Sequence, residues 1–288
     1  RAARCGLGAL GIVVSVELEC RTDYQIEEHL AFYNTLDAVL EAEADYPLQQ
    51  FFLLPWSWRF LAQHRRESPQ PRSWHAGLYR LFWWLWLDIG LHLIITSIAR
   101  RKFLKGTTQR VFRTLLPRLV VPGWRVVDRA ADQLVMEHQL FRHIEIELFV
   151  TRSKLPAAVR LAQDLMSALG GEAGAVSPQT WEELESIGLA ERVRLLEGSY
   201  CHHYVVCVRK VLADDSPISM AGPRHAGVGS SDEEESSYAL SFISYHAPHD
   251  RQGFYDFAQV LCEAMAQLVE GRPHWGKYCP LDRATLQR

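Results

Sequence analysis

Hydrophobic and polar residues alternate strictly over residues 143–150, and this period of two predicts a half-buried strand. Similar runs over residues 202–212 and 237–247 predict two more strands. Helical spacing predicts an amphipathic helix from Pro156 to about residue 169 and another over residues 253–271. The order strand, helix, strand, strand, helix is typical of a ferredoxin-like antiparallel sheet backed by helices. The predicted fold class is therefore α+β.

Glycines dominate the beginning of the chain. Gly6, Gly8 and Gly11 precede an alternating apolar run over residues 12–18, which predicts a glycine-rich turn that leads into a strand. The three glycines match the letter spacing of the dinucleotide-binding motif G-x-G-x-x-G, but that motif requires a helix directly after it. Because a strand is predicted here, the pattern does not indicate a dinucleotide site of that kind.

A helix is predicted to begin at Asp23. Asp is a favourable N-cap residue, and the carboxylates of Glu27 and Glu28 suit the positive end of a helix. Apolar residues then follow at helical spacing. The next stretch, residues 51–66, combines aromatic and basic side chains. Residues 23–140 are therefore predicted to form a largely helical, aromatic part of the protein.

The longest apolar stretch, residues 78–98, has three interpretations. Its length approaches the roughly 20 residues that span a bilayer, but Asp88 inside it would cost roughly 2.5–3.5 kcal/mol at bilayer depth. Basic residues flank the stretch on both sides, and together with its tryptophans they suit a helix that lies on an anionic membrane surface. Two interpretations are kept, namely contact with a membrane surface through residues 78–105 and a buried core helix. A helix that spans the membrane is disfavoured.

Composition narrows the class of partner. The chain has 288 residues, of which 48% are hydrophobic, so a substantial core is expected, and its net charge of −3 gives no basic field for nucleic acid. None of the six cysteines forms a C-x-x-C pair, so neither a zinc site nor a disulfide framework is indicated, and reduced thiols are expected. His202 and His203 are neighbours on a predicted strand and point to opposite faces, so no metal site is predicted.

Residues 272–280, with the sequence RPHWGKYCP, place chemically active groups together directly after the second predicted helix. Lys277 is a cation, His274 is a titratable ring and Trp275 is a large aromatic surface. Loops on a rigid scaffold often carry catalytic groups. On the residues alone, the simpler interpretation is a C-terminal turn in which Trp275 packs on the core and Lys277 is solvated.

Three short segments resemble one enzyme family. The sequence His-Trp-Gly-Lys that ends at Lys277 resembles the signature of the sugar-1,4-lactone oxidases, such as D-arabinono-1,4-lactone oxidase and L-gulonolactone oxidase, which are FAD enzymes of the vanillyl-alcohol-oxidase superfamily. The sequence Gly-Ala-Leu-Gly-Ile over residues 8–12 resembles the end of their FAD-binding domain. Residues 207–221 resemble their Glu-x-Arg strand and the Ala-Asp-Asp that follows it.

This resemblance implies an FAD cofactor and assigns roles to particular residues. Gly8, Gly11 and Ile12 are implied neighbours of FAD, and a plain turn is the alternative for them. Lys277 and Arg209 are the implied catalytic cations, and Lys277 is also an implied FAD contact. A fixed cation stabilises the negative charge that reduction leaves near N1 and the C2 carbonyl of a flavin.

The substrate site implied by the resemblance departs from the family at one position. Its implied members are Cys207, Arg209, His274 and Trp275. The catalytic Glu of the family falls on Cys207, and an apolar pocket keeps a thiol mostly neutral, so no catalytic carboxylate is carried over. A structural ion pair between Arg209 and Asp214 or Asp215 is the alternative to a catalytic role for Arg209.

The resemblance also implies a domain organisation. The implied parts are the end of an FAD-binding domain (residues 1–22), a substrate-binding cap domain (residues 23–270, with a helical part 23–140 and a sheet part 141–270) and an active-site segment (residues 271–288). Because the chain begins at Arg1 without Met, we expect it to be the C-terminal part of a longer protein.

The implied reaction is the FAD-dependent oxidation of a sugar 1,4-lactone, with a hydride passed to the flavin and electrons to oxygen or another acceptor. Oxidation of a linear alditol is a related alternative. A catalytically silent or truncated cap-type module that binds a membrane or a protein partner is an alternative of another class, and Cys207 favours it. Residues 78–105 imply a peripheral membrane location, with the cytoplasm as the alternative.

Overall fold

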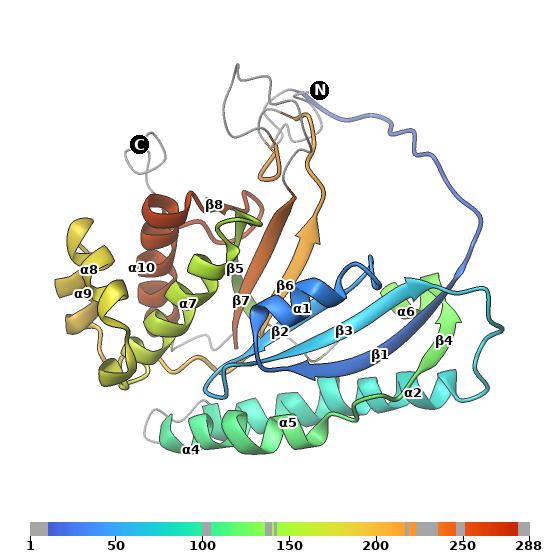
Figure 1. The fold of residues 1–288 in the computed structure, drawn as a ribbon, viewed down its shortest axis with the longest axis horizontal. Helices are drawn as coiled ribbons and strands as arrows, with labels where there is room; N and C mark the ends of the chain where they lie inside the picture. Colours follow the sequence, from blue (N-terminus) through green and yellow to red (C-terminus); the bar gives the residue numbers. More distant parts are fainter. Residues whose placement is uncertain are drawn as a thin grey trace.

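An eight-stranded sheet runs through the computed structural model, with its strands in the order β4-β1-β3-β2-β6-β7-β5-β8 (Figure 1). The structure describes residues 11–99, 105–135, 140, 143–216, 219–222, 236–245 and 251–281. Each pair of neighbouring strands in this sheet is antiparallel. Strands from both halves of the chain therefore belong to one sheet, and the α+β class is as predicted.

The second half of the sheet has the predicted ferredoxin-like order. Its elements are β5 (His143–Thr151), α7 (Leu155–Leu169), β6 (Val206–Val211), β7 (Ser237–Tyr245), α10 (Gln252–Val269) and β8 (Arg272–Pro273). Strand β7 lies between β5 and β6, and β8 extends the sheet beyond β5, as in a β-α-β-β-α-β unit. Three short helices precede β6, namely η6 (Ala173–Ala175), α8 (Pro178–Ser186) and α9 (Ala190–Leu195).

Strand β6 begins later than the predicted start at His202. The carbonyl oxygen of Cys201 lies 2.9 Å from Nδ1 of His203, and the carbonyl of His202 accepts a 2.8 Å hydrogen bond from the indole of Trp56. Side chains therefore satisfy these backbone groups, which consequently do not join a neighbouring strand.

The predicted helix at Asp23 is wrong, because this region forms the strand β1 (Gln25–Tyr33). Strand β1 pairs with β3 (Arg59–Glu67) on one side and with β4 (Val126–Arg129) on the other, which satisfies its backbone hydrogen bonds on both edges. A helix begins only at α1 (Leu36–Ala42), where the hydroxyl oxygen of Thr35 accepts a hydrogen bond from the amide of Ala38.

The aromatic stretch that follows is a β-hairpin and not part of a helical region. Strand β2 (Gln50–Leu54) pairs with β3, and the turn between them holds Trp56 and Trp58 with φ angles of 69° and 54°. The indole of Trp56 is buried, so its hydrogen bond to His202 helps to fix this left-handed turn. The predicted helical character of residues 23–140 is therefore wrong for β1 to β3.

A layer of helices covers the β1–β3 end of the sheet (Figure 1). It contains α2 (Ala76–Trp83), η2 (Trp84–Leu91), α3 (His92–Ile94), η3 (Ile95–Ala99), α4 (Lys105–Arg110), η5 (Val111–Leu115) and α5 (Leu116–Leu119), and α6 (Ala130–Leu134) follows β4. A helix over residues 78–98 is thus confirmed. Judged by length and composition alone, one described helix, Ala76–Ser97, could cross a membrane.

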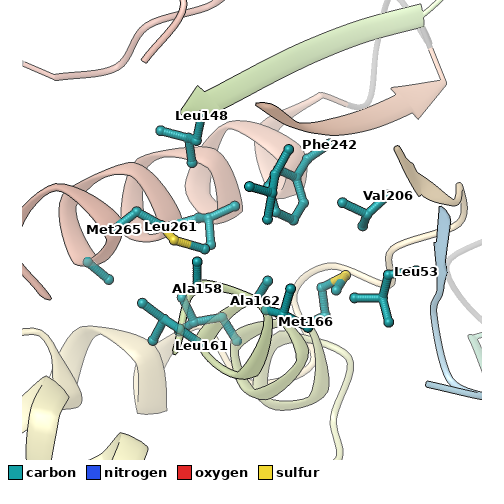
Figure 2. Packing of buried hydrophobic residues seen from close by; sticks show 14 of the residues in the cluster. Leu53, Leu148, Ala158, Leu161, Ala162, Met166, Val206, Phe242, Leu261 and Met265 are labelled. Carbon is teal, nitrogen blue, oxygen red and sulfur yellow. The ribbon is translucent and has the colours of Figure 1, made fainter. Parts of the chain in front are cut away.

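The larger core lies between the sheet and helices α7 and α10. Figure 2 shows Leu148 of β5 and Phe242 of β7 against Ala162 of α7 and Leu261 of α10, and all four are fully buried. Each buried Leu or Phe side chain stabilises the fold by roughly 1.5–3 kcal/mol. Because side chains alternate along a strand, the odd-numbered residues of β5 face the opposite side of the sheet.

Residues 11–20 form no regular element, so the predicted strand over residues 12–18 is wrong in this structure. A strand requires a partner for its backbone hydrogen bonds, and among the described residues no strand pairs with this segment. Ile12 is accordingly 93% exposed.

Candidate active site

One row of side chains crosses four strands on the sheet face opposite α7 and α10. The strand register aligns Phe52 of β2 with Cys207 of β6, Cys207 with Ser241 of β7, and Ser241 with Glu147 of β5. Adjacent strands lie about 4.8 Å apart, so directly opposed side chains in such a row touch. The row therefore changes from apolar at Phe52 to charged at Glu147, and Cys207 lies at the change.

Arg209 belongs to this site through an ion pair that the sequence analysis did not foresee. Its Nη2 lies 2.6 Å from Oε1 of Glu147 and 3.3 Å from the hydroxyl oxygen of Ser241. Glu147 is 5% exposed, whereas Arg209 is 49% exposed. The alternative pairing with Asp214 or Asp215 does not occur in the part of the chain that the structure describes. The guanidinium thus projects from the sheet, held by a buried carboxylate.

Lys277 reaches the same strand from the C-terminal segment. Its ammonium group forms an ion pair with Glu145, two residues before Glu147 on β5. The amide of His274 donates to the carbonyl of Glu147 at 2.8 Å, and the amide of Tyr278 donates to the carbonyl of Glu145 at 3.4 Å. These backbone bonds dock the segment on the edge of β5, so the two implied cations lie beside one strand.

Glu145 and Glu147 are the partners of the two cations that the sequence alone did not identify. Residues i and i+2 of a strand share a face and lie roughly 7 Å apart, so Glu145 and Glu147 place Lys277 and Arg209 at neighbouring positions. The strict alternation over residues 143–150 had already put both glutamates on one face. Two carboxylates on one face of a strand that is partly buried need charged partners. This need was the signal in the sequence that could have identified the two ion pairs.

His274 and Trp275 lie at the turn that leads to Lys277. Nδ1 of His274 accepts a 2.9 Å hydrogen bond from the amide of Gly276, and its ring centre is 6.0 Å from that of Phe149 on β5. Trp275 is partly exposed, so it is not packed on the core as the simpler interpretation of this segment required.

Cys207 lies where the resemblance to the lactone oxidases implies a glutamate, but its thiol cannot act as a carboxylate does. Burial raises the pKa of its thiol to about 11, so the sulfur stays protonated at neutral pH. Its Sγ is 3.7 Å from Oε1 of Gln50, whose amide nitrogen donates to Oε1 of Gln63. Cys207 is therefore a neutral, weakly polar wall and neither a base nor a charged ligand.

A cavity of about 260 Å³ lies between the sheet and the helix layer, and Cys207 is part of its wall. Its apolar wall includes Phe52 and Leu61 from the sheet and Trp86 and Phe112 from the helices. Gln50 and Gln63 are the amide side chains in the wall, and no charged side chain lines the cavity among the described residues. The charged residues Arg209 and Glu147 are not part of the cavity wall, and Cys207 is the member of the row that connects the two regions.

The residues fit a flavin cofactor at the cations. Arg209 and Lys277 have side chains that are 49% and 34% exposed, so both can approach negative charge that develops outside the sheet. Gly11 has a left-handed φ of 122° with open space around it, and the exposed Ile12 packs on none of these strands. Gly8 lies outside the described residues.

His202 and His203 lie away from the charged end. Burial lowers the pKa of His202 to about 3 and the pKa of His203 to about 4, so both rings are neutral at physiological pH. Nε2 of His203 accepts a hydrogen bond from the amide of Tyr245. Among the described residues, no group of three or more His, Cys, Asp or Glu could hold a metal ion.

Comparisons with known proteins identify the family of this chain. The family model described as D-arabinono-1,4-lactone oxidase matches residues 16–288. A curated relative, a long-chain alcohol oxidase from an uncultured marine euryarchaeote, is 45% identical over 286 residues, which make up 99% of this chain and 58% of the relative. The chain thus spans a little under three fifths of the length of that relative.

Solved structures share the fold. Cholesterol oxidase from B. sterolicum matches 88% of this chain and 49% of its own chain, with a TM-score of 0.51 and 12% identity. A mutant of the Brevibacterium sterolicum enzyme matches the same shares with a TM-score of 0.50 and 10% identity. At such low identity, the likeness concerns the fold alone.

Proposed function

Because this chain belongs to the D-arabinono-1,4-lactone oxidase family, whose members are FAD-dependent oxidases, we propose that it forms the substrate-binding part of such an oxidase. The proposed substrate carries an alcohol group on a largely apolar body. The observation that carries this proposal is the apolar cavity of about 260 Å³, whose wall includes Cys207, on the same face of β6 as Arg209.

The cavity lining favours an apolar body for energetic reasons. A 150 Å³ apolar cavity already holds a benzene molecule, so about 260 Å³ has room for a larger hydrocarbon group. Each methylene that enters gains about 0.8 kcal/mol. A sugar buries a hydroxyl group at nearly every carbon, and each one left without a partner costs roughly 1–3 kcal/mol. The relative described as a long-chain alcohol oxidase supports the same substrate class.

The two cations are proposed to serve the redox step. FAD, when bound, takes up the hydride of the carbinol carbon. Arg209 and Lys277 would then lie near N1 and the C2 carbonyl and hold the negative charge that reduction leaves there. Gly11 and Ile12, together with Gly8, are proposed neighbours of the cofactor. Oxygen or another acceptor is the proposed destination of the electrons.

The other side chains of the site have proposed binding roles. Cys207 would face the carbon atoms next to the alcohol group, and His274 and Trp275 would close the charged end. The proposed parts of the protein are the end of an FAD-binding domain (residues 1–22), a cap domain (residues 23–270) and an active-site segment (residues 271–288).

Oxidation of a sugar 1,4-lactone is the second candidate function. The description of the family supports it, and so do the amide side chains of Gln50 and Gln63, which could bind hydroxyl groups at one side of the cavity. A linear alditol would need the same amide contacts.

Primary alcohols of increasing chain length test the proposal. We expect kcat/KM to rise about fourfold with each added methylene, because about 0.8 kcal/mol corresponds to that factor, until the cavity is full. The measurement is turnover by the full-length, FAD-containing protein with an artificial electron acceptor. A flat dependence on chain length, combined with faster turnover of D-arabinono-1,4-lactone, would favour the lactone instead.

We also propose that the helix layer contacts a membrane surface. Large apolar side chains on the outer side of helix Ala76–Ser97 are about half exposed, namely Leu78, Leu81, Trp84, Leu85 and Leu93. Basic residues follow in the sequence as far as Arg118, and they would attract an anionic surface. In sedimentation with anionic lipid vesicles, we expect the variant Leu81→Glu/Leu85→Glu to lose most of the binding of the wild type. Equal sedimentation of both proteins would show that these side chains do not mediate contact with the membrane.

A further inference from the structure

We propose that Glu147 is the proton acceptor for the alcohol group of the substrate. This role rests on the proposed function, because it concerns the same oxidation. Cys207 is a titratable residue in the cavity wall, and it cannot take a proton because burial keeps its thiol protonated. The question is therefore which described side chain can accept the proton at this end of the cavity.

Glu147 has one carboxylate oxygen in use and one available. Arg209 donates to Oε1 at 2.6 Å, and the hydroxyl of Ser241 donates to the same Oε1 at 3.1 Å. Within the described part of the chain, Oε2 accepts no hydrogen bond. Strand β7 separates Glu147 from Cys207, and Ser241 lies between them in the row. An alcohol whose hydroxyl group reaches from Cys207 over Ser241 would therefore find an anionic acceptor that two donors already hold in position.

The neighbouring carboxylate is not equally free. One oxygen of Glu145 binds the ammonium group of Lys277, and its other oxygen lies 3.4 Å from Nε2 of His143. The remaining groups at this end of the row are the cation Arg209 and the hydroxyl of Ser241, neither of which is a base at neutral pH. Glu147 is thus the described carboxylate whose open oxygen lies on the row that leads to Cys207.

The proposed step balances in atoms and charge. The O–H bond of the alcohol breaks, and its proton forms a bond to Oε2 of Glu147. The C–H bond at the carbinol carbon breaks at the same time, and the hydrogen leaves with its electron pair to FAD, the oxidant of the proposed function. The carbon–oxygen bond becomes the carbonyl bond of the product. Arg209 stays paired with Oε1 and keeps the carboxylate in place as it becomes neutral.

Glu43 offers a matched control on the other face of the sheet. It is 6% exposed, it forms an ion pair with Arg152 at 3.1 Å, and it accepts a 2.6 Å hydrogen bond from the hydroxyl of Tyr238. Its surroundings therefore resemble those of Glu147, with one guanidinium and one hydroxyl, and the ammonium group of Lys210 lies 3.8 Å from its Oε2 as well. The variant Glu43→Gln reports the effect of neutralising a buried, paired carboxylate on stability alone.

The test compares the full-length, FAD-containing wild type with Glu147→Gln and Glu43→Gln. We expect Glu147→Gln to lower the rate constant for anaerobic flavin reduction by an alcohol about 10²–10⁴-fold, the usual contribution of a positioned base. Binding of the alcohol, followed by the fluorescence of the cavity residues Trp83 and Trp86, should change less than about threefold, because the apolar body supplies most of the affinity. Glu43→Gln should reduce at the wild-type rate.

A pH profile separates proton acceptance from mere positioning of Arg209. In the wild type the rate should fall on the acid side as the carboxylate becomes protonated beside Arg209, Lys277 and Glu145, and this limb should disappear in Glu147→Gln. Glu147→Asp, which keeps the charge and the pairing, should retain the acid limb at a reduced rate, and it replaces Glu147→Gln if that variant does not fold.

Infrared difference spectra supply a readout that does not depend on turnover. Reduction by alcohol should produce the carbonyl band of a protonated carboxylic acid in the wild type and not in Glu147→Gln. Wild-type reduction rates in Glu147→Gln, or an acid limb that persists in it, would overturn the role of Glu147 and leave the proposed function intact. A wild type that no alcohol reduces would overturn both.

Discussion

Replacing Arg209 by Met is expected to lower the rate constant for flavin reduction about 10²–10³-fold, the usual effect of removing one fixed group that stabilises developing charge. The variant also leaves the buried carboxylate of Glu147 without its charged partner, which costs about 2 kcal/mol of folding stability. Anaerobic stopped-flow reduction measures the first effect, and urea denaturation measures the second. Lys277→Ala should slow reduction in the same direction and leave the fold intact.

Arg192→Met is the control for the loss of an arginine from an ion pair. Arg192 is bound to Glu263 at 3.0 Å and is about as accessible as Arg209, but it lies on α9, away from the row that contains Cys207. We expect it to reduce flavin at the wild-type rate. If Arg209→Met and Lys277→Ala also retain that rate, neither cation serves the redox step, and their ion pairs with β5 are structural.

Introducing a charge into the cavity wall should abolish the preference for long alcohols. Phe52 lines the cavity and lies directly opposite Cys207 in the row across the sheet. In Phe52→Asp, an alkyl chain would have to pack against a carboxylate that must stay hydrated, and burial of such a charge costs several kcal/mol. We expect kcat/KM for a long-chain primary alcohol to fall about 10²-fold or more.

A short alcohol provides the internal control for this variant. Its alkyl group ends near Cys207, so its kcat/KM in Phe52→Asp should stay within about threefold of the wild-type value. Leu195→Asp, at an exposed site on α9, controls for the added negative charge. If Phe52→Asp lowers turnover of short and long alcohols equally, the chain does not lie along this wall, and the cavity has another use.

The secondary structure of the ferredoxin-like half was predictable because its pattern of hydrophobic and polar residues fits only one type of element in each segment. The strict alternation in β5 fits a strand and no helix, and Gly170 and Gly171 mark the end of α7. In β1, Ile26 and Leu30 are four residues apart, and positions at that spacing share a face in a strand as well as in a helix. Pairing with β3 and β4 makes this segment the strand β1 and not a helix. A local sequence pattern does not show which distant segments will pair with it.

The charged end of the site was predictable only in part. Arg209 and Lys277 came from the resemblance to the lactone oxidases, and the structure brings both to β5. The pairing of these cations with Glu147 and Glu145 depends on strand register. Contacts between distant segments set that register, since Glu147 and Arg209 are more than 60 residues apart in the sequence. The position of Cys207 between Phe52 and Ser241 depends on register in the same way.

The proposed substrate class rests on the cavity and not on the sequence motifs. The residues that form its apolar wall come from strands β2, β3, β6 and β7, from helices α2, η2, η5 and α5, and from the segments that follow α5 and precede β6. No short motif contains them. The prediction that residues 23–140 are largely helical also gave no reason to place them in the same sheet as Arg209. The expectation of a sugar lactone therefore rested on the motifs that contain Arg209 and Lys277, and it took no account of the cavity.

The most direct test of the proposed function is the rate constant for anaerobic reduction of bound FAD in the full-length wild type. It is measured with a long-chain primary alcohol and with D-arabinono-1,4-lactone at equal concentrations. We predict at least about tenfold faster reduction by the alcohol, because burial of two methylenes already supplies about 1.6 kcal/mol. Faster reduction by the lactone would contradict an apolar substrate for this site.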